Sequence, residues 1–260
     1  GFDRPMAEQY LQWIGSVLLH GDFGTSLWRQ TPVADMLAAR LPVTLELSLL
    51  ALAIALSIAL PVGILSAIRQ DTAADYIARS FSIFMLAVPG FWIATIVVVF
   101  PAIWWGWSPE VKFTPFREDP LANLKQLIIP ALIMGTSLSA VTIRMMRTTM
   151  LEVLRQEYVR TAWAKGLGER VVVVRHVLRN ALIPVVTVIG LQATLLIGGS
   201  VIMEQIFVIP GMGLLLIEAV FDRDYPIVTG VFLVTGVAIV LINFLVDLSY
   251  GLLDPKVRLE

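Results

Sequence analysis

The side chains that could do chemistry in this chain gather in one charged stretch, EYVRTAWAKGLGERVVVVRHVLRNALIP, at positions 157–184. Eight of the chain's 19 lysines and arginines lie between Arg144 and Arg179, against three glutamates. Gly166 and Gly168 are predicted to end a first helix, and a second short helix is predicted over 171–177. This layout favours a surface that docks into a groove on another protein. The alternative is a solvated connector with no further role, although a plain turn needs far fewer residues.

The sequence indicates neither an active site nor a metal site. The chain has no cysteine and two histidines, His20 and His176, and we expect His176 to structure the charged stretch. No G-x-x-x-x-G-K sequence occurs, so the chain offers no phosphate-cradling loop and is not expected to hydrolyse ATP. A net charge of -1 gives no support to nucleic-acid binding.

Five uncharged or nearly uncharged runs flank this charged stretch or lie elsewhere in the chain, and they are the elements expected to hold it in place. They predict membrane spans at about 41–68, 80–107, 126–146, 181–203 and 226–250. A helix needs roughly 20 apolar residues to cross the hydrocarbon core, and the chain is 57% hydrophobic. Buried helices of a soluble core are the alternative, but a soluble helix normally shows a polar stripe. The predicted fold class is an all-α membrane protein, a polytopic helical bundle with five visible transmembrane helices.

The charges of the loops predict the orientation. Basic loops stay on the cytoplasmic side, so the connector at 147–180 is predicted to be a cytoplasmic loop. The loop at 204–225 carries four acids against one arginine and suits the outside. Counting crossings then predicts an extracytoplasmic cap at residues 1–40 and a cytoplasmic C-terminus, with His20 and His176 on opposite sides. Since the cap holds no apolar export segment, we expect a further membrane helix upstream, making six spans.

The cap at 1–40 carries two helix signals. An apolar stripe from Tyr10 to Leu18 recurs at helical spacing, and it is expected to pack on protein because its polar face is not basic. Thr31 followed by Pro32 predicts the start of a second helix with the threonine hydroxyl as N-cap. In the external loop, Gly211 and Gly213 are predicted to allow tight turns.

The charged stretch resembles the cytoplasmic signature loop of ATP-binding-cassette (ABC) importer permeases, in the dipeptide, oligopeptide and nickel branch. Arg160 stands where the general importer signature has Glu, and Arg179 where it has Pro, so the likeness is to the branch. Trp163 departs from the branch, in which a basic residue is common. The matching residues are Glu157, Tyr158, Arg160, Thr161, Ala162, Ala164, Lys165, Gly166, Leu167, His176, Leu178, Arg179, Asn180, Ala181, Leu182, Ile183 and Pro184.

Four further stretches resemble the same branch, so the likeness covers nearly the whole chain. They are 21–27, 41–47, an external set of Glu204, Phe207, Pro210, Gly211, Gly213, Arg223, Asp224, Tyr225 and Pro226, and a C-terminal set of Asp247, Tyr250, Leu253, Asp254 and Pro255.

The resemblance implies a non-catalytic permease subunit in the cell membrane of a bacterium or archaeon. Its implied partners are a second, related permease, two ATP-hydrolysing subunits, an external substrate-binding protein and the lipid bilayer. ATP and Mg²⁺ would be bound by the partner subunits, and no cofactor by this chain. Peptides are the default solute, although similar relatives carry nickel, glutathione or oligosaccharides. The loop residues expected to couple to the ATPase are Glu157, Tyr158, Arg160, Thr161, Ala162, Lys165, Gly166, Leu167, His176, Arg179 and Asn180.

Polar residues within the predicted spans are candidates for a solute pathway. Such groups often mark a pathway, but they equally often hydrogen-bond neighbouring helices, and both interpretations stay open. The second class of function is a stand-alone channel or ion-coupled carrier, which would be expected to bury carboxylates at mid-membrane. None is seen there, since Glu46 and Asp247 lie near span ends. The pathway candidates are Gln192, Thr194, Ser200 and Asn243.

Overall fold

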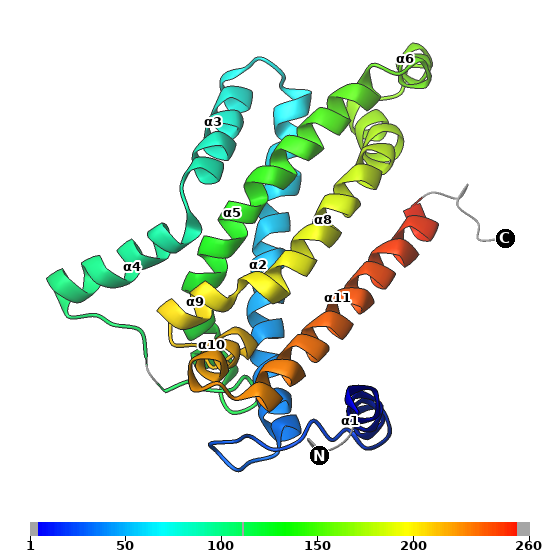
Figure 1. Ribbon diagram of the computed structural model, residues 1–260. Coiled ribbons are helices and arrows are strands. Elements are labelled where there is room, and N and C mark those ends of the chain that lie inside the picture. The colour runs from blue at the N-terminus through cyan, green and yellow to red at the C-terminus, as the bar shows by residue number, and fades with distance from the viewer. Residues whose placement is uncertain (1–4, 111, 254–260) are drawn as a thin grey trace.

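The computed structural model describes residues 5–110 and 112–253, and the regular elements in these ranges are helices. The predicted all-α class is confirmed. Four long helices run lengthwise through the molecule (Figure 1): α2 (Val33–Ile68), α5 (Pro120–Leu154), α8 (Arg179–Gly199) and α11 (Tyr225–Leu253). The shorter elements are α1 (Met6–His20), α3 (Ala73–Ala87), α4 (Gly90–Trp105), α6 (Glu157–Ala164), α7 (Glu169–Val171), the π-helical η1 (Val172–Leu178), α9 (Val201–Ile206) and α10 (Met212–Asp222).

The centre of the bundle is the contact between α2 and α5. Ala51, Ala55, Ala59 and Gly63 recur every fourth residue along α2, and all four are buried. A Cβ added at Gly135 of α5 would lie 2.7 Å from the Ala51 carbonyl oxygen. Small residues at helical spacing let two backbones approach closely, which is how helices gain packing energy where lipid removes the hydrophobic drive.

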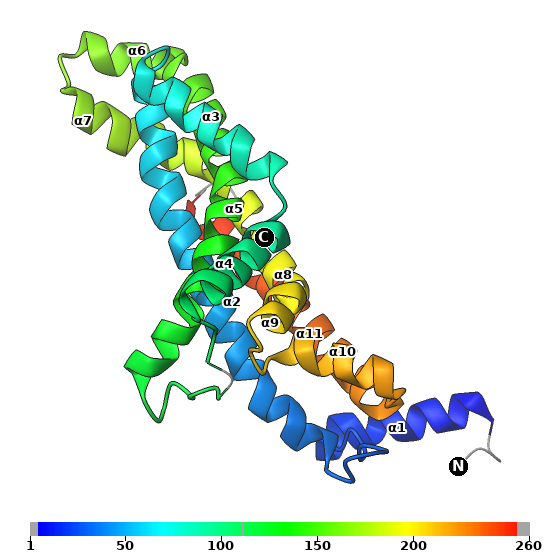
Figure 2. The ribbon, with the colours of Figure 1, turned by 90° about the vertical axis from the view of Figure 1, so that its left-hand side faces the viewer.

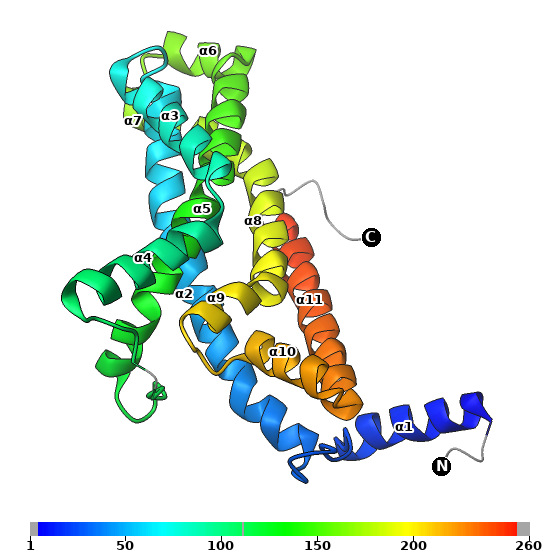
Figure 3. The ribbon, with the colours of Figure 1, turned by 60° about the vertical axis from the view of Figure 1, so that its left-hand side comes forward.

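The short elements divide between two ends of an elongated molecule (Figures 2 and 3). The helices α6 and α7 lie at one end, called the α6 end below. The helices α1 and α10 lie at the opposite end, called the α10 end. In Figure 1, α11 starts beside α10 and rises toward the α6 end. The loop that joins α5 to α8 and the loop that joins α9 to α11 are therefore at opposite ends, as the sequence predicted.

Four helices of the described chain are long and apolar enough to cross a membrane. The run expected as a span at 80–107 is instead divided between α3 and α4, which are bent by 84° across Val88 and Pro89. Proline lacks the N–H that would continue the helix, and Val88 is extended. The described chain has five candidate spans if this bent pair is counted as one.

The charged connector is shorter than its sequence suggests. The helix α5 continues to Leu154, and a continuous helical path of α7, η1 and α8 begins at Glu169. The separate second helix expected over 171–177 is wrong, because those residues are the first turns of that path. Within 147–180, only the segment from Arg155 to Gly168 lies outside the two long helical paths, and α6 occupies its middle.

The helix signal at Thr31 is correct in place and wrong in detail. The helix α2 starts at Val33, so Pro32 holds the N-cap position and no side chain caps the helix. The Thr31 hydroxyl contacts the Met36 sulfur at 3.4 Å instead. In α1 the expected stripe forms, but Val17 is its only buried residue and Tyr10 stays 60% exposed, so within the described chain this stripe is mostly unpacked.

Candidate functional site

The helix α6 is an amphipathic helix seated on the end of the bundle. Its inner face consists of Val159, fully buried, and Ala162, 5% exposed. Both belong to one apolar cluster with Met146 and Met150 of α5 and the three buried valines of η1. Its outer face carries exposed residues, Glu157, Arg160, Thr161 and Trp163. The apolar face holds α6 against the long helices, and the polar face is left open for contact with another molecule.

Gly166 ends α6 through a backbone conformation that favours glycine. Its φ is +79°, in the left-handed region, where a Cβ crowds the backbone. Its N–H donates to the Trp163 carbonyl at 2.9 Å, which closes the last turn. No atom lies within 4 Å of the position a Cβ would take. The glycine is needed here for its φ, and the space around it is free.

Three residues that the sequence singled out separately meet beside α6. The Asn180 side-chain amide donates to the Tyr158 hydroxyl at 2.8 Å and to the His176 carbonyl at 3.1 Å. The Tyr158 hydroxyl donates to the same carbonyl at 3.3 Å. His176 contributes its backbone carbonyl to these bonds, and a role of its side chain in structuring the loop stays a prediction. The network ties α6 to the junction of η1 and α8, where the helix winds as a π-helix, a form common at functional sites.

The remaining loop residues, apart from Leu167, lie on the open surface. The Arg160 guanidinium pairs with Glu157 at 2.9 Å, and the two side chains are 73% and 84% exposed. The Thr161 hydroxyl donates to the Glu157 carbonyl. Lys165 and Arg179 are exposed, while Leu167 packs against the α6 cluster. An exposed ion pair of this kind contributes little to folding stability, so the charges of this surface are available to a partner.

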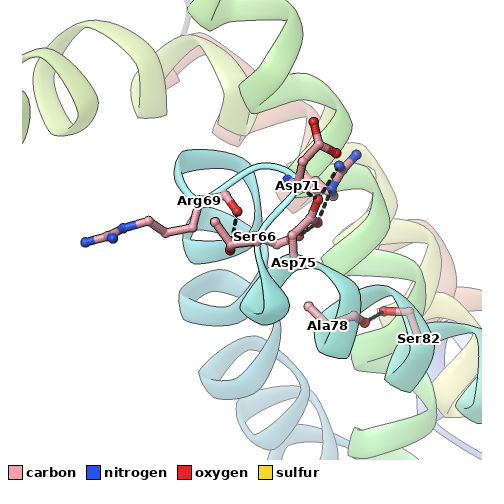
Figure 4. Close-up of polar contacts among 8 residues, drawn as sticks. Ser66, Arg69, Asp71, Asp75, Ala78 and Ser82 are labelled. Atoms are coloured by element: carbon pink, nitrogen blue, oxygen red, sulfur yellow. Dashed lines mark hydrogen bonds and ion pairs between the residues drawn. The ribbon is translucent and has the colours of Figure 1, made fainter.

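Sequence reasoning missed a buried ion pair between α3 and α5. Asp75 of α3 is fully buried, and its two carboxylate oxygens each lie 2.7 Å from a different guanidinium nitrogen of Arg147 on α5. The Ser66 hydroxyl and the Asp71 N–H also donate to this carboxylate, at 2.5 and 3.0 Å. Figure 4 shows Ser66 and Asp71 beside Asp75. Arg147 looked like one more loop charge, because the spacing in sequence does not show that Asp75 folds against it.

A second buried carboxylate, Glu204, holds the α10 end together. It is fully buried and accepts hydrogen bonds from the Thr44 hydroxyl at 2.8 Å, the Ser200 hydroxyl at 2.7 Å and the Leu214 N–H at 2.9 Å. The Thr44 oxygen in turn accepts from the Met212 N–H at 2.8 Å. The side chain expected on an acidic external loop instead links α2, α9 and α10.

Gly211 and Gly213 lie against this carboxylate and its helix, and this close approach is a second reason for glycine beside the turn at Gly211, whose N–H donates to the Ile209 carbonyl at 2.8 Å. Gly211 has φ of −100°, which any residue can adopt. A Cβ there would lie 2.4 Å from the Glu204 carboxyl carbon. A Cβ at Gly213 would lie 2.6 Å from the Val201 Cα. Both glycines are required because the carboxylate and its helix approach the backbone closely.

The other external-loop residues connect this loop to the N-terminal segment. Asp224 is 1% exposed and accepts from the Ser26 hydroxyl at 2.5 Å and the Leu27 N–H at 3.0 Å. Arg223 takes a left-handed conformation at the end of α10, with φ of +56°. Pro210 borders a cleft that it shares with Glu46 of α2. With Glu204 and Asp224 buried, the loop presents a less acidic surface than its sequence predicts.

The pathway candidates fall into different environments. The Gln192 amide receives a hydrogen bond from Thr142 at 3.1 Å and donates to the Leu138 carbonyl at 2.9 Å, linking α8 to α5. Ser200 is engaged by Glu204. The Thr194 hydroxyl is buried without a hydrogen-bond partner among the described residues, and Asn243 is exposed on α11. The contacts of Gln192 and Ser200 favour helix bonding, whereas Thr194 and Asn243 retain free polar groups.

Comparison with known families identifies one match across most of this architecture. Residues 59–259 match the model described as "Binding-protein-dependent transport system inner membrane component". The oligopeptide transport system permease protein of Bacillus subtilis is 41% identical over 261 residues, covering 99% of this chain and 82% of that protein. The dipeptide transport system permease protein of Escherichia coli is 38% identical over 281 residues, covering 99% and 83%.

Solved structures share the arrangement of helices. A chain of the MetNI methionine ABC transporter, in an inward-facing conformation, superposes with a TM-score of 0.66 at 17% identity, covering 84% of this chain and 96% of that one. A chain of an amino acid ABC transporter superposes with a TM-score of 0.60 at 13% identity, covering 82% and 92%. At this identity the likeness speaks for the fold alone.

Proposed function

The chain belongs to the family of binding-protein-dependent transport system inner membrane components, and from this premise we propose that it conducts peptides. It is a permease subunit of an ABC importer, built from several membrane helices. The peptide assignment is supported by the relatives at 38–42% identity, which are named as peptide, dipeptide or oligopeptide permeases. Family membership also argues against the stand-alone channel or ion-coupled carrier.

The observation that carries the coupling proposal is the open polar face of α6. A short helix held by its apolar side, with Glu157, Arg160 and Trp163 outward, fits helix-in-groove recognition by another protein. We assign this face to one ATP-hydrolysing subunit, and a second permease would supply the matching helix for the other. The α10 end would then face the external binding protein, with the C-terminus on the ATPase side.

ATP hydrolysis belongs to the partners in this proposal. The sequence contains no G-x-x-x-x-G-K stretch, whose backbone N–H groups and lysine hold the phosphates of ATP. The purified chain is expected to show no ATPase activity, and substrate-stimulated hydrolysis should appear only in the assembled complex. Hydrolysis by the chain alone would contradict this division of roles.

The decisive experiment is Gly166→Asp, with Gly106→Asp as its matched control. Both glycines have left-handed φ, +79° and +64°, and neither has an atom within 4 Å of its Cβ position. A side chain at either glycine is therefore expected to strain the backbone by a similar amount, about 1 kcal/mol. Gly106, however, ends α4, a helix that lies far from α6 (Figures 1 and 3). Gly166→Asp also adds a carboxylate to a basic surface.

We expect Gly166→Asp to reach the membrane at the normal level, to lose transport, and to co-purify less ATPase subunit. Gly106→Asp should keep both transport and association. Equal effects of the two variants would mean that backbone strain is responsible. Wild-type transport by Gly166→Asp would mean that α6 is a passive connector.

A further inference from the structure

The Asp75–Arg147 pair is built as a rigid clamp between α3 and α5. Both guanidinium contacts are 2.7 Å, the two-pronged geometry that makes arginine–carboxylate pairs strong and directional. Asp75 is fully buried and Arg147 keeps 19% of its side chain exposed. Removing one partner would leave the other charge uncompensated in a poorly hydrated site, which is strongly unfavourable. The clamp therefore resists separation of α3 from α5.

The clamp shares its packing with the coupling helix. Arg147 follows Met146, and Ser66 precedes Ala67, and both Met146 and Ala67 belong to the apolar cluster that buries Val159 and Ala162 of α6. A displacement of α6 must therefore move the adjoining ends of α5 and α2. The clamp extends that unit to α3, whose main helix contacts are with α2 and α5.

The other end of α3 is a break. Its helix stops at Ala87, and α4 departs at 84° after Val88 and Pro89. The helix α4 packs on α5 and α9, toward the α10 end (Figure 1). The clamp and the break thus lie at opposite ends of the same 15-residue helix.

We propose that the Asp75–Arg147 clamp makes α3 move with the coupling helix, so that the bend at Val88–Pro89 opens and closes during transport. Asp75 and Arg147 are positioning residues in this proposal, since they act through the placement of α3. The inference rests on the proposed function in one respect, namely that α6 receives the movement of the ATPase. A few extended residues that absorb a change of angle are the usual form of a hinge.

The first test is Asp75→Asn in the assembled complex, with Ser82→Ala as control. Asparagine keeps the size of the side chain and removes its charge. Ser82 is buried on the same helix and bonds only to the Ala78 carbonyl of its own turn. We expect Asp75→Asn to retain ATPase association while the solute transported per ATP falls about tenfold, an ordinary loss of coupling free energy. Ser82→Ala should keep the wild-type ratio.

A ratio of transport to hydrolysis separates coupling from general damage, because a merely unfolded fraction lowers both together. An unchanged ratio in Asp75→Asn overturns the proposal. Loss of ATPase association in Gly166→Asp together with unimpaired coupling in Asp75→Asn would overturn the clamp alone. Normal association in Gly166→Asp would overturn the proposed contact at α6, which is a separate result.

A second measurement leaves the clamp intact and decides the matter if Asp75→Asn does not assemble. The chain has no native cysteine, so pairs of spin labels can be placed at the exposed positions Ile77, Glu152 and Trp104. Between nucleotide-free and ATP-bound complexes, the Ile77–Glu152 distance should stay constant while the Ile77–Trp104 distance changes. A constant Ile77–Trp104 distance, or a change in Ile77–Glu152, would rule out the swing of α3.

Discussion

The two ends of the bundle use glycine for opposite reasons. At the α6 end, Gly166 adopts φ of +79° in open space, so the backbone conformation demands it. At the α10 end, Gly211 has an ordinary φ, but a Cβ would meet the Glu204 carboxyl carbon at 2.4 Å. Gly166 ends α6 on an exposed surface, whereas Gly211 makes room for the buried Glu204 carboxylate.

The buried carboxylates Asp75 and Glu204 also differ between the two ends, in the charge of their hydrogen-bond donors. The Asp75 carboxylate is paired with the charged guanidinium of Arg147, whereas Glu204 accepts hydrogen bonds from two hydroxyls and one backbone N–H. Pairing with arginine links α3 and α5, the two helices that we propose move with α6. Neutral donors from α2, α10 and the start of α9 hold these three helices against Glu204. The contrast predicts that changes at the α10 end act on stability and changes at the α6 end act on association.

The comparison first requires that the two ends face opposite sides of the membrane. Single cysteines can be placed at Thr25 and Pro115, exposed at the α10 end, and at Lys165, exposed at the α6 end. We expect an impermeant thiol reagent added to intact cells to label the first two and to leave position 165 unlabelled, because basic loops stay inside. Permeabilised cells provide the control, in which all three positions should react. Labelling of position 165 from outside would reverse the assignment of the ends.

The largest expected effect on stability is that of Gly211→Ala. The added methyl group cannot fit beside the Glu204 carboxylate without moving it or the backbone. Overpacking of this kind costs about 3 kcal/mol, so the purified complex should melt at a lower temperature and accumulate less. Gly198→Ala, at a helical glycine with no atom within 4 Å of its Cβ position, should leave the melting temperature unchanged or raise it. Similar melting of the two variants would contradict the close-approach explanation.

A smaller loss is expected for Thr44→Val. Valine keeps the shape of threonine, but it removes one donor to Glu204 and the acceptor of the Met212 N–H. Leaving buried polar groups unpaired costs about 2 kcal/mol, which thermal melting should detect while ATPase association stays normal. In the control, Thr95→Val, the lost hydroxyl bonds only within its own exposed helix turn. Weakened ATPase association in Thr44→Val would contradict the expectation that changes at the α10 end act on stability alone.

The smallest effect is expected for Arg160→Glu, on the open surface of α6. Its pair with Glu157 is exposed, so stability should not change. Reversing one charge at the edge of a contact should weaken ATPase association about fivefold at low salt and less at high salt. Arg117→Glu, an exposed arginine on the loop before α5, should leave association unaffected. An effect of Arg160→Glu on melting temperature would place this charge in the fold rather than at a contact.

Much of the plan of the molecule could be predicted from local pattern. Uncharged runs such as 226–250 predict helices because each span must satisfy its own backbone in lipid. The Gly166 turn was also predictable, because its glycine requirement is a property of the local backbone. In the same stretch, the second helix expected over 171–177 is continuous with α8. Gly168 is the N-cap of this helical path, and the sequence does not show whether a glycine precedes or follows a helix.

Residues that act across the fold were not predictable from spacing. Asp75 and Arg147 are 72 positions apart, and Thr44 and Glu204 are 160 apart. Sequence reasoning assigned Glu204 to an acidic surface and Gly211 to a turn, because an isolated acid and an isolated glycine usually have those roles.

The sequence by itself determined the helical class, the charge asymmetry of the loops and the basic character of the stretch around α6, since each depends on composition and neighbouring residues. Only the tertiary structure decided which acids are buried, why Gly211 must be glycine and where the second predicted span breaks. Those features depend on contacts between distant helices, and a buried charge is tolerated only where such contacts supply its hydrogen-bond partners.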